Sequence, residues 1–266
     1  MKLVAIIGYG AIARHVAGVL ADRESIRLAG VIGRAGSLDA ARAAMGDGVA
    51  VVGDICELPT RPDLVLDCAG HSGLIAHGER VLRQGIDLTS VAAGALADDS
   101  LRDTLAAAAR DGQARLRIAA GAIGGLDVLA SAREGGLARV TYRGRKPPAS
   151  WRGTPAETIL DLDRLGAART HFRGSAREAA RLYPKNANVT ASIALAGIGF
   201  DATEVELVAD PACTSNCHEL EAEGDFGTFT LRLQGRPLPD NPKSSALTAM
   251  SMIHAALSLE TPILVA

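Results

Sequence analysis

A glycine-rich loop stands directly after the first apolar run of the sequence and at the start of the first helical pattern. The apolar run covers 2–7, the helical pattern covers 11–21, and the loop reads Gly8-Tyr9-Gly10-Ala11-Ile12-Ala13. In a βαβ unit such a loop turns tightly at its first glycine and lets the backbone approach a pyrophosphate at its second, while a third small residue allows close helix–strand packing. The N–H groups at the start of the helix attract phosphate. The loop therefore predicts dinucleotide binding through these residues: Gly8, Gly10, Ala11 and Ile12.

Short apolar runs and helical patterns go on alternating as far as about residue 120. After the first, strands are expected at 26–32, 49–52, 63–69, 86–91 and 116–119, with helices between most of them. Continuous apolar strands that alternate with helices are typical of a parallel sheet covered on both faces. The sequence thus predicts an α/β fold, a Rossmann-type doubly wound parallel sheet, with a dinucleotide-binding domain over 1–120.

The pattern changes after Gly121. A helix is expected near 125–134 and a strand at 137–143, and two or three helical stretches are expected over 155–198. Strands at 204–209, 217–223 and 228–233 alternate polar and apolar residues and are joined by turns, so they are expected to pair antiparallel. We predict an α+β domain for substrate binding and dimerisation over 121–240. A last helix, expected near 243–259 within the segment 241–266, is predicted to pack back on the first domain.

Composition excludes several classes of protein. Lys plus Arg number 28 against 30 Asp plus Glu, so the basic excess of a nucleic-acid binder is absent. Aromatic residues make up only 3%, which disfavours stacking on single strands. The apolar runs fall short of the roughly 18 residues of a membrane helix, and the N-terminal stretch carries no signal-peptide cleavage pattern. Four cysteines are no disulfide framework. A cytoplasmic enzyme is expected.

The end of the second strand bears on the choice of cofactor. An NAD-specific site places an Asp or Glu there to bind the ribose hydroxyls. This sequence reads Val31-Ile32-Gly33-Arg34-Ala35-Gly36-Ser37, with no acid. An arginine can pair with a 2′-phosphate, so Arg34 predicts that NADP is accepted. The alternative is an Arg34 that points to solvent or stacks on the adenine, and the choice between NAD and NADP stays open.

Four further segments carry a resemblance to a known family. They are Ala119-Ala120-Gly121-Ala122-Ile123-Gly124-Gly125-Leu126-Asp127, Tyr183-Pro184-Lys185-Asn186-Ala187-Asn188-Val189, Asn216-Cys217-His218-Glu219-Leu220 with Gly224-Asp225-Phe226-Gly227, and Asn241-Pro242-Lys243-Ser244-Ser245-Ala246. In their order and spacing the chain resembles the L-aspartate dehydrogenase family over its whole length. The resemblance implies oxidation of L-aspartate by NAD or NADP to iminoaspartate, which hydrolyses to oxaloacetate and ammonia. It also implies a homodimer and, in some organisms, a supply of iminoaspartate for NAD biosynthesis.

The same resemblance assigns individual roles. It implies that His218 is catalytic and that Ala122 and Asn188 contact the cofactor. Lys185 and Lys243 lie in matching segments and are the first candidates to hold the two substrate carboxylates, which need cationic partners.

Side-chain chemistry gives each of these residues a second interpretation. Strand alternation places His218 on the apolar face of its strand, where it can move protons at neutral pH or be a core histidine. Asn188 stands where a helix N-cap is expected. Ala122 is also explained by a tight turn. His71, after the fourth strand, is a weaker candidate for the cofactor crevice.

Three polar groups receive structural interpretations. Cys213 and Cys217 with His218 lack the fourth ligand of a zinc site, so no metal is expected. The acidic pair Asp161 and Asp163 is interpreted as solvated surface. The run Arg143, Arg145 and Lys146 is expected to be a solvated strand end, with recognition of a dicarboxylate as the alternative.

These inferences converge on an NAD(P)-dependent amino-acid dehydrogenase acting on L-aspartate, with no nucleic-acid or membrane partner. Two alternatives remain open at this point. One is a related reductase of the dihydrodipicolinate-reductase-like type, although its His-His pair with a nearby lysine is not found. The other is a non-catalytic dinucleotide-sensing protein, for which no partner surface is evident.

Overall fold

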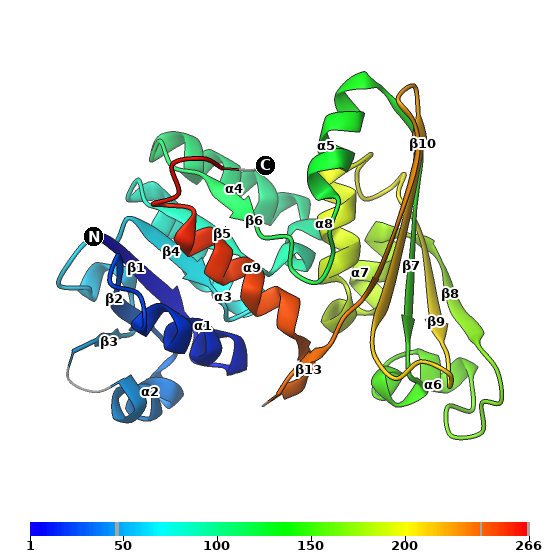
Figure 1. Cartoon of the computed structure of the whole chain (residues 1–266), viewed down its shortest axis with the longest axis horizontal. Helices are drawn as coiled ribbons and strands as arrows, with labels where there is room; N and C mark the ends of the chain where they lie inside the picture. The colour runs from blue at the N-terminus through cyan, green and yellow to red at the C-terminus, as the bar shows by residue number, and fades with distance from the viewer. Residues whose placement is uncertain (46–47, 240, 265–266) are drawn as a thin grey trace. The chain divides into compact units, whose positions relative to one another are not determined.

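The computed structural model describes residues 1–45, 48–239 and 241–264, without the side chains of residues 185, 242 and 243. The chain forms two compact units (Figure 1). Unit 1 consists of Met1–Gly121 and Leu238–Ala266, and unit 2 of Ala122–Pro237. No helix in the described part of the chain is long and apolar enough to cross a membrane.

Unit 1 contains a six-stranded parallel sheet in the order β3-β2-β1-β4-β5-β6. This order is that of a doubly wound dinucleotide-binding fold, whose ligands bind at the carboxyl ends of the strands. The predicted fold class is therefore confirmed. The strands are β1 (Lys2–Ile7), β2 (Ile26–Ile32), β3 (Ala50–Val52), β4 (Leu64–Asp67), β5 (Asp87–Ser90) and β6 (Leu116–Ile118).

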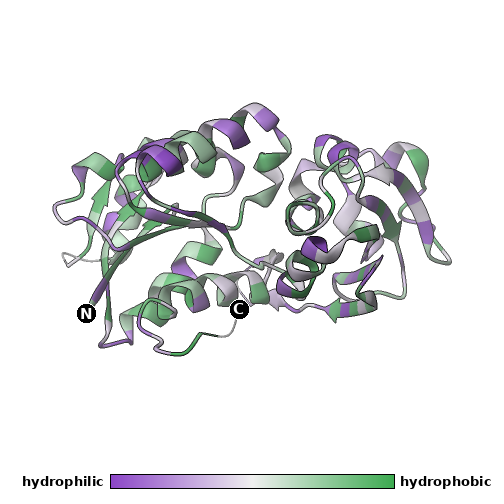
Figure 2. Ribbon diagram, turned by 90° about the horizontal axis from the view of Figure 1, so that it is seen from above, coloured by the Kyte–Doolittle hydropathy of each residue, from purple (hydrophilic) through white to green (hydrophobic). Residues whose placement is uncertain are grey.

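Helices cover both faces of this sheet. α1 and α9 lie side by side over one face (Figure 1), where Val16 of α1 and Met252 of α9 are buried against Ile6 of β1. α3 and α4 pack together on the opposite side and contact β4, β5 and β6. Because helices cover both faces of the sheet, the buried residues of its strands are mostly apolar (Figure 2). The helices of unit 1 are α1 (Ala11–Ala21), α2 (Leu38–Met45), α3 (His71–Arg83), α4 (Asp99–Asp111) and α9 (Ala246–Leu257).

The start of the last helix differs from the prediction. α9 begins at Ala246, later than expected, because Asn241–Ser245 forms the strand β13, which pairs with β12 (Pro237–Leu238). An Asn-Pro pair favours extended backbone before the proline, which fits a strand better than the first turn of a helix.

Unit 2 contains a mixed sheet in the order β11-β10-β7-β9-β8. β10 pairs antiparallel with both β11 and β7, as expected, but β9 runs parallel to β7, so the expectation of purely antiparallel pairing was wrong there. In Figure 1 three helices, α5, α7 and α8, lie on one side of this sheet. The elements are α5 (Leu126–Gly135), β7 (Leu137–Lys146), α6 (Ala156–Ile159), β8 (Arg169–Ser175), α7 (Ala176–Leu182), α8 (Asn188–Ala196), β9 (Glu204–Ala209), β10 (Cys217–Gly224) and β11 (Gly227–Gln234).

The strand β8 lies where helix was expected. It is an edge strand paired with β9 alone, and its sequence RTHFRGS has no run of apolar residues. The helix α7 starts only after it, where Ser175 and Glu178 form a reciprocal capping box.

Candidate active site

Unit 1 has a cavity of about 510 Å³ at the carboxyl ends of β1, β2 and β4. This is where a doubly wound sheet binds its ligand. The lining residues are Ile7, Gly8, Tyr9, Gly10, Ile32, Gly33, Arg34, Ser37, Cys68, Ala69, Ser72, Gly73, Ala76 and His77. Gly8, Gly10 and Arg34, which the sequence predicted for the cofactor, thus line one cavity. Ala11, Ile12 and His71 are not among its lining residues.

The geometry of the glycine-rich loop fits a pyrophosphate. Gly8 has a φ of +97°, and a Cβ there would lie 2.8 Å from the Cβ of Ala69, so a larger residue is excluded. A Cβ on Gly10 would meet nothing within 4 Å, which leaves open space in front of α1. Gly10 is the N-cap of α1 without a side-chain hydrogen bond, and the first turn holds no acid. The helix N-terminus is thus open to an anion.

A buried carboxyl group fixes the loop that faces Gly8. Asp67 Oδ1 accepts the N–H of Ala69 at 3.0 Å, and its Oδ2 accepts the hydroxyl of Ser90 at 2.6 Å. Burial raises the pKa of Asp67 to about 6. These bonds hold the end of β4 against the end of β5 and place Ala69 in contact with the phosphate loop.

Arg34 follows β2 and lines the same cavity with an exposed side chain. Ser37 donates its hydroxyl to the carbonyl oxygen of Arg34 at 2.9 Å, which closes the turn after the strand. The lining residues include no Asp or Glu.

The predicted catalytic histidine lies in unit 2, on β10. His218 stands opposite Gly144 of β7 in the antiparallel register and is only 3% exposed. Its neighbours on the same face, Leu220 and Ala222, are buried as well. The expectation that His218 points inward is therefore confirmed.

Tyr142 holds the imidazole of His218. The phenol oxygen lies 2.8 Å from Nδ1, and the two rings stack with 6.0 Å between their centroids. Gly144 makes this contact possible, because a Cβ there would lie 2.8 Å from the oxygen of Tyr142 and 3.2 Å from Cδ2 of Leu207. The alternation Tyr142, Gly144, Lys146 along β7 puts all three residues on the face that carries His218.

The surroundings keep His218 neutral. Burial, and in second place the positive charge of Lys146, lowers the pKa of His218 to about 3. Burial also raises the pKa of Tyr142. The bond between the phenol and Nδ1 therefore joins two uncharged groups at neutral pH.

Lys146 is the last residue of β7, and its ammonium group contacts an amide and an indole ring. Its Nζ donates to Oδ1 of Asn186 at 2.6 Å and lies 5.2 Å from the ring centre of Trp151. Burial lowers the pKa of Lys146 to about 8. Its two arginine neighbours were expected to be solvated, but they form ion pairs on the opposite face: Arg143 with Glu206 and Glu219, and Arg145 with Asp210. Among the described residues, no carboxylate pairs with Lys146.

An aromatic cluster continues from Lys146 toward the edge of the sheet. Trp151 is fully buried and contacts His171 with 4.3 Å between ring centroids. His171 Nδ1 lies 3.1 Å from the hydroxyl of Tyr183, while its Nε2 is buried without a hydrogen-bond partner in the described part of the chain. Burial lowers the pKa of His171 to about 4.

This low pKa predicts a pH dependence of stability. In the unfolded chain His171 titrates near its usual value of about 6.5, so the unfolded state binds the extra proton first. The contribution of His171 to stability is expected to fall as the pH drops below that value and to level off near pH 4. The free energy of unfolding of His171→Phe should lose the corresponding slope, at most about 1.4 kcal/mol per pH unit. Urea unfolding between pH 7 and 4 measures it, with His15→Phe, at an exposed position of α1, as the control. Equal slopes in wild type and His171→Phe would contradict the assignment.

Comparison with known proteins decides the family. Residues 127–259 match the family profile described as aspartate dehydrogenase, C-terminal, and residues 8–119 match the NAD binding domain of homoserine dehydrogenase. A protein of Ruegeria pomeroyi named L-aspartate dehydrogenase is 54% identical over 95% of this chain and 90% of its own. A Serratia proteamaculans protein of the same name is 46% identical over 97% of both chains. The chain belongs to the aspartate dehydrogenase family.

Solved structures agree with this membership. The crystal structure of an aspartate dehydrogenase from Thermotoga maritima superposes with a TM-score of 0.80 at 26% identity, covering 100% of both chains. A dihydrodipicolinate reductase from Paenisporosarcina sp. covers 97% of this chain and 92% of its own with a TM-score of 0.53 and 15% identity. The similarity to the dihydrodipicolinate reductase shows a shared fold and nothing more.

The other residues predicted for this aspartate dehydrogenase family member lie in unit 2 or outside the described atoms. Ala122 is half-buried in the loop at the start of unit 2. Asn188 is the first residue of α8, and the N-cap is Ala187, so the expected capping role of Asn188 was wrong. The side chains of the predicted substrate lysines, Lys185 and Lys243, lie outside the described part of the structure.

The cysteine group around His218 and the acidic pair Asp161 and Asp163 form no functional site of their own among the residues that the structure describes. In the part of the chain that is described, no cluster of three or more His, Cys, Asp and Glu could hold a metal ion. Cys213 contacts Asp210 instead, with 3.6 Å from sulfur to carboxylate oxygen.

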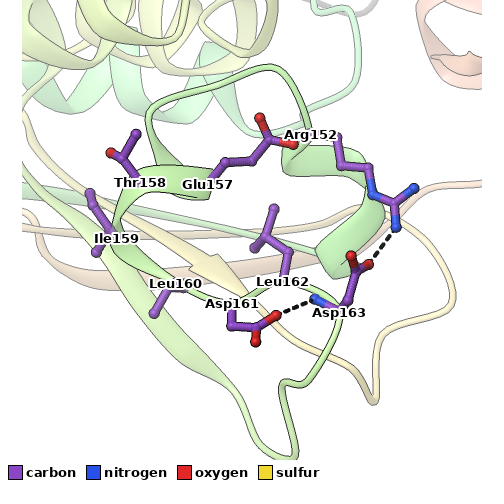
Figure 3. Close-up of a pocket in the computed structure, with 8 residues that line it drawn as sticks. All are labelled: Arg152, Glu157, Thr158, Ile159, Leu160, Asp161, Leu162 and Asp163. Atoms are coloured by element: carbon purple, nitrogen blue, oxygen red, sulfur yellow. Dashed lines mark hydrogen bonds and ion pairs between the residues drawn. The ribbon is translucent and has the colours of Figure 1, made fainter.

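A second surface hollow, shown in Figure 3, lies along residues 152–163, where Asp161 and Asp163 are exposed as expected. Arg152 forms an ion pair with Asp163, and Asp161 accepts the backbone N–H of Asp163.

Tyr142 and Trp151 are site residues that the sequence did not reveal, and Lys146 was predicted only as part of the basic run for which recognition of a dicarboxylate was the alternative. Their signal is the period of two along 137–146, which places Tyr142 and Lys146 on one face, apart from Arg143 and Arg145. The local sequence does not reveal that Arg143 and Arg145 pair with acids while Lys146 contacts an amide and an indole ring.

Proposed function

We propose that the protein is an NAD(P)-dependent L-aspartate dehydrogenase, which oxidises L-aspartate to iminoaspartate and releases oxaloacetate and ammonia after hydrolysis. The observation that carries this proposal is the identity of 54% and 46% with proteins named L-aspartate dehydrogenase over almost the whole chain. The chemistry of unit 2 supports it, since a buried neutral histidine shares a sheet face with a lysine that has no carboxylate partner among the described residues.

The residues of unit 1 are assigned to the cofactor. The N–H groups of Ala11 and Ile12 would hold the pyrophosphate above Gly8 and Gly10, and Arg34 would face the adenosine ribose. We assign Ala122 and Asn188 to the nicotinamide end. When bound, NAD(P)⁺ supplies the acceptor for the hydride that leaves Cα of the substrate.

His218 is proposed as the general base for the hydrolytic step. Its neutral imidazole can take a proton at Nε2 from the water that attacks the imine carbon. For this the other ring nitrogen, Nδ1, must carry a proton and donate it to the phenol oxygen of Tyr142, 2.8 Å away. The hydroxyl of Tyr142 can accept this hydrogen bond and so holds the ring in place in the tautomer that the reaction requires. The negative charges of the substrate raise the low pKa of His218 toward the working range.

The assay that tests this function is direct. Dialysed protein is mixed with NADP⁺ or NAD⁺ and L-aspartate, and the absorbance of the reduced cofactor is followed. We expect reduction that depends on both protein and L-aspartate and that forms ammonia in equal amount. Reduction of neither cofactor by L-aspartate would overturn the proposed function.

Acceptance of NADP is proposed from Arg34, and a single substitution tests it. Arg34→Asp should shift the ratio of kcat/KM for NADP to that for NAD by roughly 10- to 100-fold toward NAD, because a carboxylate repels the 2′-phosphate and accepts the ribose hydroxyls. Arg14→Asp, at an exposed position of α1, controls for the change in net charge. An unchanged ratio in Arg34→Asp would show that the arginine points away from the cofactor.

Assembly, compartment and pathway complete the proposal. We propose a homodimer, following the family resemblance, and light scattering of the purified protein tests it. We place the reaction in the cytoplasm, where thiols stay reduced, and all four cysteines are unpaired. A supply of iminoaspartate for NAD biosynthesis is the metabolic role that fits this product.

A further inference from the structure

We infer that Lys146 binds a carboxylate of the substrate and thereby determines the specificity of the site for dicarboxylic amino acids. This inference rests on the proposed function. Binding of a substrate carboxylate was predicted for Lys185 and Lys243, whose side chains the structure does not describe. The inference assigns this role to Lys146, whose contacts it does describe.

The first argument is the balance of charge in unit 2. Arg143 donates to Glu206 at 2.6 Å and to Glu219 at 3.2 Å, and Arg145 donates to Asp210 at 3.0 Å. Lys146, next in sequence, contacts an amide oxygen and an aromatic face, and no carboxylate pairs with it in the part of the chain that the structure describes. A cation removed from water without a counter-charge is costly. Burial lowers the pKa of Lys146, and a carboxylate bound to its ammonium group would supply the counter-charge.

The second argument is the position of the ammonium group. Lys146 and His218 lie on the same face of the sheet, because His218 is opposite Gly144 and Lys146 follows two residues later on β7. The charge of Lys146 reaches the imidazole, whose pKa it lowers. A carboxylate bound to Lys146 would therefore stand beside the proposed base.

The third argument is that the side chain is held in place. Asn186 accepts one proton of Nζ at 2.6 Å, and the buried ring of Trp151 supports the ammonium group from 5.2 Å. The indole is itself fixed by its N–H, which donates to the carbonyl oxygen of Val208 at 3.1 Å. An ammonium group has three donors, so two remain for an anion. Such preorganisation is expected of a recognition site rather than of a solvated strand end.

Lys146→Met tests the inference kinetically, since methionine keeps much of the apolar stem and removes the charge. The value of kcat/KM for L-aspartate should fall by roughly 30- to 3,000-fold, mainly through KM, while KM for the cofactor stays unchanged. Lys146→Arg should recover part of the loss. Lys2→Met, at a half-exposed lysine of unit 1 paired with Asp63, is the matched control. Wild-type kcat/KM for L-aspartate in a folded Lys146→Met protein would overturn the inference.

A binding experiment separates this inference from the proposed function. The pKa values of the lysines in the wild-type chain are measured by NMR on ¹³C-labelled lysine, with and without succinate, and Lys146 is assigned from Lys146→Arg. We expect succinate to raise the pKa of Lys146 in the absence of any turnover. This outcome would support the inference even if L-aspartate is not oxidised. An unchanged pKa of Lys146 at saturating succinate would refute it, whether or not Lys146→Met folds.

Discussion

The His218→Ala variant is expected to lose roughly 10²–10⁴ of kcat for L-aspartate oxidation and to bind the cofactor as the wild type does. The loss has this size because a positioned general base typically contributes that much to a rate. It should fall on kcat, because the proton is transferred in the transition state and not on binding. Cofactor affinity should be spared, because the phosphate loop and the cavity beside it belong to unit 1, and His218 belongs to unit 2.

Two further variants make the test specific. His218→Asn keeps a polar group that can pair with Tyr142 but cannot take a proton at neutral pH, so it should be as inactive as His218→Ala. His254→Ala, at an exposed position of α9, is the control for removing a histidine. Activity, cofactor titration by fluorescence and a melting curve are measured on each. A stably folded His218→Ala that binds cofactor and works within a few-fold of wild type would mean that His218 is a core histidine only.

L-Aspartate is expected to be oxidised at least roughly 10³-fold more efficiently than L-alanine, as a ratio of kcat/KM values. A site built to pair a polar group rejects the analogue that lacks it strongly, because its own buried groups are then left without partners. L-Alanine lacks the side-chain carboxylate, so it leaves one of the cationic partners unpaired. The reaction should also run best at alkaline pH, because the substrate amine must be neutral before hydride can leave.

L-Malate is the complementary comparison. It keeps both carboxylates and replaces the amine by a hydroxyl, so it tests recognition of the reacting group rather than of the charges. We expect it to inhibit as a dicarboxylate and to turn over poorly. Steady-state rates with the three substrates at one pH give both ratios. Turnover of L-alanine equal to that of L-aspartate would show that the second carboxylate is not recognised.

The phosphate-binding loop of unit 1 could be predicted from sequence because its determinants are local. The turn at Gly8, the open N-terminus of α1 and the absence of an acid near Arg34 are all set within one βαβ unit. The strand order follows from the same alternation, since apolar strands separated by helices have few ways to form a parallel sheet.

The arrangement of the candidate site residues in unit 2 depends on long-range pairing, which a local sequence pattern does not contain. Tyr142 meets His218 only because β7 and β10 pair in one register and because position 144 is glycine. Lys146 donates to Asn186, which lies 40 residues further along the chain, so no local pattern could pair them. The strand β8 was missed, because an edge strand held by a single neighbour needs no strong apolar alternation.

Transfer of deuterium from the substrate tests the central claim most directly. The protein is incubated with NADP⁺ and L-aspartate carrying deuterium at Cα, and the reduced cofactor and the carbon product are analysed by mass spectrometry. The account predicts one deuterium in each reduced nicotinamide ring and oxaloacetate without it, and a turnover lowered in His218→Ala. Reduced cofactor that carries no deuterium, or deuterium retained in the carbon product, would contradict the proposal that L-aspartate is oxidised by hydride transfer from its Cα.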